Sequence, residues 1–194
     1  MSNKMSALSE NRLRIEVTGG FLLLTALTGF FCGEGMLLAA AVAAAAHELG
    51  HVAAMLRQGC LPSALRLDAT GACLRCTGPI PGYGQELRRA LAGPAAGIML
   101  WFLLRPLPGD FAARCGRMSL LLSAVNLLPG AGLDGERALR CLILRRWEPS
   151  RAERLLRSAQ WTAALGCFAG GLRWNPQLCL YGFWLLLRSA GIGD

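Results

Sequence analysis

The chain alternates between long apolar runs and short basic loops, and this alternation constrains its fold more than any other feature. Hydrophobic residues make up 54% of the 194 residues, whereas charged residues make up only 16%. A soluble domain carries about 25% charged residues, and a membrane-spanning helix needs roughly 20 mostly apolar residues. The sequence therefore predicts one membrane-embedded domain over residues 1–194, with no separate soluble domain.

The predicted fold class is an all-α, multi-pass membrane protein with about six transmembrane helices. The expected spans are residues 17–32, 36–57, 86–104, 118–129, 161–171 and 177–187. The first run has the basic flank of a signal peptide, but Phe30 and Phe31 stand where cleavage needs small residues, so we expect it to stay as a helix. Core helices are expected within about 17–146 and two extra helices within about 154–188.

Two connecting segments have their own patterns. Residues 58–85 are rich in Gly and Pro, and the short segments 64–67 and 72–76 predict a small β-hairpin at the membrane surface. Residues 130–157 are basic and helical in pattern, which is typical of a helix lying on that surface.

The net charge of +8 is distributed between the apolar runs rather than along one stripe, which argues against nucleic-acid binding. With six crossings and a cytoplasmic N-terminus, sixteen of the 20 Lys and Arg residues fall on the cytoplasmic side. This bias follows the positive-inside rule. We therefore expect a cell-membrane protein with both termini in the cytoplasm.

The eight cysteines are scattered and do not form the framework of a secreted disulfide scaffold. Cys73 and Cys76 make a CxxC pair, but a structural zinc site needs a second ligand pair. We expect reduced thiols, with a loop-borne site shared by Cys60, Cys73 and Cys76 as the alternative.

Both histidines of the chain lie in one apolar stretch, AAAAHELGHVAAM, at residues 43–55. Because positions i and i+4 share one face of a helix, His47 and His51 can bind the same ion. Glu48 is placed to activate water beside that ion, which is the chemistry of the HExxH motif of zinc hydrolases. Ionisable side chains inside a membrane helix are functional by default. The sequence therefore predicts a Zn2+ site.

A catalytic zinc takes three protein ligands and a water, so a third ligand must come from elsewhere in the chain. Asp134 is the first candidate, because it follows the fourth apolar run at about the depth of His51. Glu136 is the alternative, and Cys141 is a weaker one. Asn126 has two interpretations. Its amide either binds a substrate carbonyl or a developing oxyanion, or it bonds to a neighbouring helix, as is common in membrane bundles.

Two motifs carry a family resemblance: His47-Glu48-Leu49-Gly50-His51 and the stretch NLLPGAGLDG at residues 126–135. The chain resembles the site-2 protease family of intramembrane zinc metalloproteases, whose pattern N-x-x-P-x-x-x-L-D-G it matches at every fixed position. Its layout is closest to the compact six-helix, sporulation-protease-like branch. The resemblance implies that His47, His51 and Asp134 bind zinc, that Glu48 activates water, and that Asn126 holds the substrate strand or the oxyanion.

The resemblance also implies a transmembrane or membrane-associated protein substrate, cleaved near the cytoplasmic face. Gly93-Pro94 resembles the family motif G-P-x-x-N, but Gly97 replaces the asparagine, which puts polar substrate contacts from that helix in doubt. Two other functions fit the same residues. A metal-ion transporter would need more ligands along its path, and an inactive regulator would not need Glu48.

Overall fold

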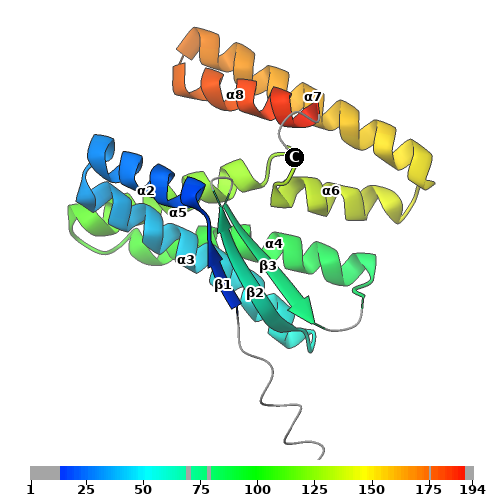
Figure 1. Cartoon of the computed structure of the whole chain (residues 1–194), viewed down its shortest axis with the longest axis horizontal. Helices are drawn as coiled ribbons and strands as arrows, with labels where there is room; N and C mark the ends of the chain where they lie inside the picture. Colours follow the sequence, from blue (N-terminus) through cyan, green and yellow to red (C-terminus); the bar gives the residue numbers. More distant parts are fainter. Residues whose placement is uncertain (1–13, 69–70, 78–79, 175, 191–194) are drawn as a thin grey trace, which may run out of the picture.

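The described part of the chain is mostly helical, with one small sheet. The structure is a computed structural model that describes residues 14–68, 71–77, 80–174 and 176–190. The elements, in chain order, are β1 (Arg14–Val17), α2 (Gly19–Cys32), α3 (Glu34–Arg57), β2 (Leu61–Asp68), β3 (Gly71–Thr77), α4 (Tyr83–Leu104), α5 (Asp110–Asn126), α6 (Asp134–Leu144), α7 (Pro149–Trp174) and α8 (Pro176–Ser189). Figure 1 shows α7 and α8 as a separate pair beside the bundle that contains α3, α4 and α5.

Helices α3 and α4 agree closely with the predicted spans 36–57 and 86–104. They are also the two helices in the described residues that are long and apolar enough to cross a membrane. The predicted separation of a surface helix from a span at residue 161 is wrong, because α7 runs without a break from Pro149 to Trp174. The count of six crossings stays a prediction.

The sheet has three strands in the order β1-β2-β3, one strand more than the hairpin expected beside the helices. The predicted hairpin is confirmed and is longer than expected: β2 and β3 are antiparallel, with Leu65 opposite Leu74. Strand β1 pairs in parallel with β2, with Ile15 opposite Leu65. The first apolar run therefore begins as a strand, and its helix starts only at Gly19.

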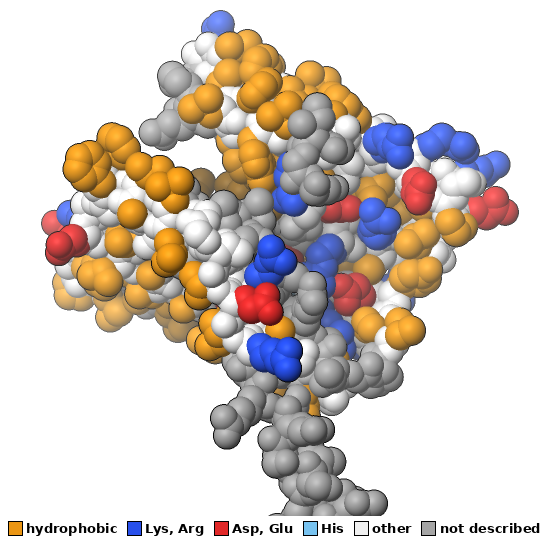
Figure 2. Space-filling model, in the orientation of Figure 1, with side chains coloured by type: hydrophobic (Ala, Val, Ile, Leu, Met, Phe, Trp, Pro, Cys, Tyr) orange, Lys and Arg blue, Asp and Glu red, His pale blue; other side chains and the backbone are white. Residues whose placement is uncertain are grey.

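The helices form two packing units. Helix α3 packs against α4 and α5, and α4 also packs against α6, whereas α7 packs mainly against α8. The two units meet where Leu133, Ala164 and Leu185 form a buried apolar cluster. Figure 2 shows hydrophobic side chains over α2 and the α7–α8 pair, and charged side chains chiefly over the sheet, α6 and the first turns of α7.

The cysteines only partly follow the expectation of reduced thiols. Five are free, namely Cys32, Cys115, Cys141, Cys167 and Cys179. Cys60 is disulfide-bonded, so the expectation is wrong at that position. The shared site expected at Cys60, Cys73 and Cys76 is untested, since the side chains of Cys73 and Cys76 lie outside the described residues.

Candidate metal centre

Three buried side chains from two distant segments converge at one point. His47 and His51 lie on α3, one helical turn apart, and Asp134 is the first residue of α6. All three are less than 10% exposed, at 4%, 7% and 7% respectively. Each offers a ligand atom, and these atoms lie within 4.8 Å of one another.

The distances match the edge of a zinc coordination sphere. Nε2 of His47 lies 3.0 Å from Oδ2 of Asp134, and Nε2 of His51 lies 3.1 Å from the same oxygen. The two Nε2 atoms are 3.2 Å apart. Tetrahedral bonds of about 2.0–2.1 Å to zinc would set neighbouring ligand atoms about 3.3 Å apart.

The hydrogen bond of His51 to the backbone orients its lone pair. Its Nδ1 lies 2.8 Å from the carbonyl oxygen of Arg89. A carbonyl only accepts, so Nδ1 carries the proton, and Nε2 of the neutral ring presents a lone pair to the other two ligands. Three short contacts join Nε2 of His47, Nε2 of His51 and Oδ2 of Asp134. One shared proton can bridge only two of these atoms, whereas a metal cation between them can bind all three. The donor set therefore fits a divalent metal ion.

Asp134 is ionised at neutral pH. Burial disfavours its charged form, but the contacts of its carboxylate with the imidazoles of His47 and His51 outweigh that effect and lower its pKa to about 2. The N-terminus of α6 also favours a negative charge at this position. Asp134 is therefore a carboxylate when it meets the two imidazoles.

Gly93 of α4 gives the histidines their space. A Cβ atom built on Gly93 would lie 2.3 Å from Nε2 of His51 and 2.7 Å from Nε2 of His47. No side chain fits there without displacing the imidazoles. The sequence singled out Gly93-Pro94 only as a motif fragment, and the contact with the histidines supplies its physical reason.

The other sequence candidates occupy different places. Glu48 is half-buried, and its charge interacts with His51, His47 and Asp134. Asn126 ends α5, and its Nδ2 donates to the Leu122 carbonyl at 3.0 Å. This is a local bond to its own helix rather than the bond to a neighbouring helix weighed from the sequence.

The alternative third ligands lie outside the cluster. The Glu136 carboxylate accepts from the Gly132 amide at 2.8 Å and from Arg140 at 3.0 Å. Among the described side chains, the group able to hold a metal contains neither Glu136 nor Cys141.

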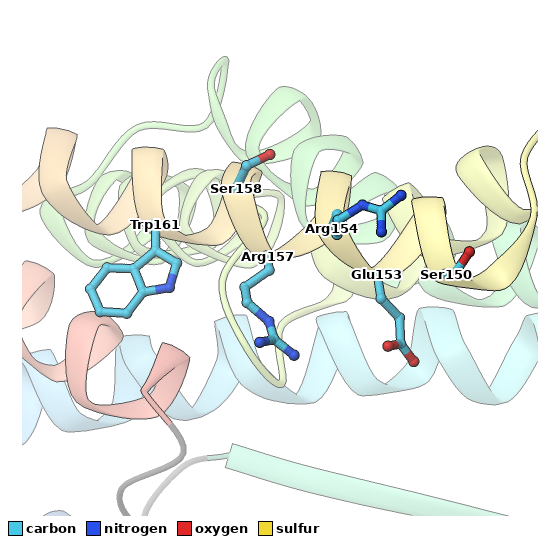
Figure 3. A pocket seen from close by; sticks show the side chains of 6 residues that line it. All are labelled: Ser150, Glu153, Arg154, Arg157, Ser158 and Trp161. Atoms are coloured by element: carbon cyan, nitrogen blue, oxygen red, sulfur yellow. The ribbon is translucent and has the colours of Figure 1, made fainter.

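Two surface grooves also lie away from this cluster. One, of about 350 Å3, follows a face of α7 and is lined by Ser150, Glu153, Arg154, Arg157, Ser158 and Trp161 (Figure 3). The other, of about 500 Å3, is lined by Leu142, Arg145 and Arg146.

The whole arrangement is similar to a solved structure, the site-2 protease from Methanocaldococcus jannaschii. The TM-score is 0.68, and the match covers 93% of this chain and 90% of that one at 20% sequence identity. The chain has the fold of a site-2 protease. Within that fold, the motifs quoted above supply the three converging side chains.

A curated relative is similar over part of its length. "Putative zinc metalloprotease sll0528" of Synechocystis sp. is 32% identical over 107 residues, and the match covers 50% of this chain and 28% of that protein. The match thus spans less than a third of the relative. No protein-family model matches the chain.

Proposed function

We propose that the chain is an intramembrane zinc endopeptidase of the site-2 protease family, which cleaves a peptide bond in or near a transmembrane segment of another protein. The observation that carries the proposal is the meeting of His47, His51 and Asp134, with ligand atoms 3.0–3.2 Å apart. The site-2 protease fold supports it independently.

The exposure of the apolar helices supports a place in the membrane. In the apolar stretch of α3 only 22% of the residues are buried inside the molecule, and in that of α4 only 28% are. The core helix of a soluble protein would be mostly buried, because its apolar face packs against the rest of the fold. Lipid is the solvent that such exposed apolar surface requires.

Each residue of the proposed site has one task. His47, His51 and Asp134 hold the metal, and a bound zinc ion supplies the Lewis acidity that lets water attack a peptide carbonyl at neutral pH. Glu48 follows His47 directly, so it can take the proton from the attacking water and pass it to the leaving amine. Asn126 holds the substrate strand or the developing oxyanion through its amide.

The topology and partners belong to the same proposal. The chain crosses the cell membrane about six times with both termini in the cytoplasm, as one metalloprotease domain. The substrate is a transmembrane or membrane-associated protein, and its helix must be unwound locally before a backbone carbonyl can reach the site. The Lys and Arg side chains that Figure 2 shows over the sheet and α6 support this orientation, because cytoplasmic segments are enriched in basic residues.

Two features favour this function over the alternatives. Among the described residues, His47, His51 and Asp134 form the only such three-ligand group, whereas a transporter would need further ligands along its path. Glu48 lies beside the cluster without being part of it. A hydrolase needs that carboxylate, whereas a transporter or an inactive regulator does not.

Zinc content and cleavage, measured on the same detergent-purified protein, test the proposal. We expect about one zinc per chain in the wild type and in Glu48→Gln, and none in Asp134→Ala. In liposomes with a model transmembrane substrate, Glu48→Gln should lose cleavage by at least about 100-fold. Glu34→Gln, the same change at the start of the same helix, is the matched control and should behave as wild type. A wild type without zinc would overturn the proposal.

A further inference from the structure

The two oxygens of the Asp134 carboxylate lie in different surroundings. Oδ2 faces the Nε2 atoms of His47 and His51, at 3.0 and 3.1 Å. Oδ1 faces Nη1 of Arg137, at 3.7 Å. One oxygen is thus directed to the candidate metal centre, and the other is directed to a guanidinium group one helical turn along α6.

Arg137 is held in place from a different helix. Its Nη2 donates to Oε1 of Glu86, in the first turn of α4. The planar fork of a guanidinium holds two carboxylates in a fixed geometry, whereas a lysine ammonium group is a point charge with rotatable donors on a flexible stem. Arg137 therefore bridges Asp134 of α6 to Glu86 of α4, and its charge also interacts with Glu48.

Stability alone does not account for this bridge. The Arg137 side chain is 44% exposed and that of Glu86 is 25% exposed. An ion pair this accessible to solvent contributes little to the free energy of unfolding. The bridge is better explained by its fixed position beside the buried carboxylate of Asp134.

The same end of α4 also orients a second ligand. The Arg89 carbonyl accepts from Nδ1 of His51, and the Arg89 side chain donates from Nε to Oε1 of Gln58 at 2.6 Å. Glu86 and Arg89 lie three residues apart on α4, so one helix turn supports both His51 and, through Arg137, Asp134. Groups that hold metal ligands in this way set ligand orientation and affinity.

We propose that Arg137 and Glu86 are positioning residues that turn the Asp134 carboxylate so that Oδ2 faces the imidazoles of His47 and His51, where a metal ion would be held. This proposal rests on the proposed function, because it assumes a metal held by His47, His51 and Asp134. It adds two residues, 51 positions apart in the sequence, to the machinery of the centre.

Zinc affinity, measured by competition with a chelator, tests the proposal in Arg137→Gln, Arg137→Lys and Glu86→Gln. We expect zinc to bind about 10- to 100-fold more weakly in Arg137→Gln. Arg137→Lys should recover only part of that loss, since it keeps the charge without the fork. Glu86→Gln should weaken binding by about 3- to 10-fold in the wild type and have no further effect in Arg137→Gln, because it acts through Arg137.

Two further measurements separate positioning from folding. Cobalt-substituted Arg137→Gln should show a changed visible absorption spectrum, since that spectrum reports the coordination geometry. Arg140→Gln is the matched control: it breaks the ion pair of Arg140 with Glu136 on the same helix, and it should change zinc affinity by less than about twofold.

If Arg137→Gln and Glu86→Gln bind zinc as Arg140→Gln does, the positioning proposal is wrong while the metal centre stands. If Arg137→Gln does not fold, Glu86→Gln and Arg137→Lys decide, and wild-type affinity in both would overturn it. A wild type without zinc overturns the proposed function instead.

Discussion

The α3–α6 bundle and the α7–α8 pair both rely on a glycine for close packing, but different groups occupy the space at that glycine. In both, a glycine lets another element approach: Gly93 of α4 faces the imidazoles of His47 and His51, and Gly171 of α7 faces the backbone of Cys179. In the bundle the space is filled by the imidazoles of His47 and His51. In the pair it is filled by the backbone and the Cβ atom of Cys179.

The difference shows where this fold places its chemistry. The bundle buries polar groups that bond to one another, such as Ser119, which donates to the Gly97 carbonyl, and Ser123, which donates to the Ser119 carbonyl. The core of the pair is apolar, with Ala164 and Leu185 fully buried. The pair meets the bundle at Leu133, directly before Asp134. Substitutions in the two units should therefore affect different properties.

Gly93→Ala should have the largest effect on the metal centre. The new Cβ would lie 2.3 Å from Nε2 of His51, so the imidazoles must move off their present positions. We expect zinc affinity to fall by about 100-fold or more, which is the upper end of the effect of supporting residues. Zinc per chain and chelator competition measure it.

Gly166→Ala is the matched control for that change. A Cβ at Gly166 of α7 meets nothing within 4 Å, so zinc binding should stay as in the wild type. Its stability should rise by roughly 0.5–1 kcal/mol, because alanine is the better helix residue. Equal loss of zinc in Gly93→Ala and Gly166→Ala would mean that a glycine-to-alanine change in a helix weakens zinc binding in general, and not through a clash with the histidines.

Gly171→Ala should damage the pair and spare the centre. Its Cβ would lie 2.0 Å from the Cys179 amide nitrogen, so α7 and α8 must separate. We expect a loss of about 1–3 kcal/mol in stability, as for other overpacked sites. Zinc per chain should remain that of the wild type. Loss of zinc in this variant would show that the two units are not independent.

Gly97→Ala tests the departure from the family's asparagine. Its Cβ would lie 2.2 Å from Oγ of Ser123 and 3.1 Å from the Ser119 carbonyl. We expect a loss of about 1–2 kcal/mol, since the serine must move. Thermal unfolding of the purified protein measures it.

Ser123→Ala should relieve much of that strain, because it removes the crowded oxygen. The double variant should then be more stable than the sum of the two single changes by at least about 0.5 kcal/mol. If the stability changes of Gly97→Ala and Ser123→Ala simply add, then Oγ of Ser123 does not occupy the space that a side chain at position 97 would need.

Much of this site could be predicted from the sequence because its signals are local. The four-residue spacing of His47 and His51 places both on one helix face, and the apolar run around them gives α3 its bounds to within two residues at its start. The position of Asp134 after the fourth apolar run and its place in the NLLPGAGLDG motif predict it as the third ligand, and the structure places it beside the two histidines.

The missing parts depend on contacts between distant residues. Strand β1 pairs Ile15 with Leu65, 50 positions apart, and four residues carry too weak a pattern to reveal it. The Arg89 carbonyl that orients His51 is a backbone group, which every residue possesses. The continuity of α7 was hidden because its polar first half and apolar second half have different compositions.

Glu136→Gln should have the smallest effect and decides between two predicted ligands. Its carboxylate accepts from the Gly132 amide at 2.8 Å, and Gly132 has a φ of 84° in the loop before α6. A glutamine oxygen can accept the same bond, so the loop keeps its shape. Only the ion pair with the half-exposed Arg140 is lost, which costs less than about 1 kcal/mol. Zinc per chain should equal that of the wild type, since the proposed function assigns the third ligand to Asp134 and not to Glu136. Loss of zinc here, with retention in Asp134→Ala, would make Glu136 the ligand and move the metal centre toward the loop at Gly132, closer to the α7–α8 pair.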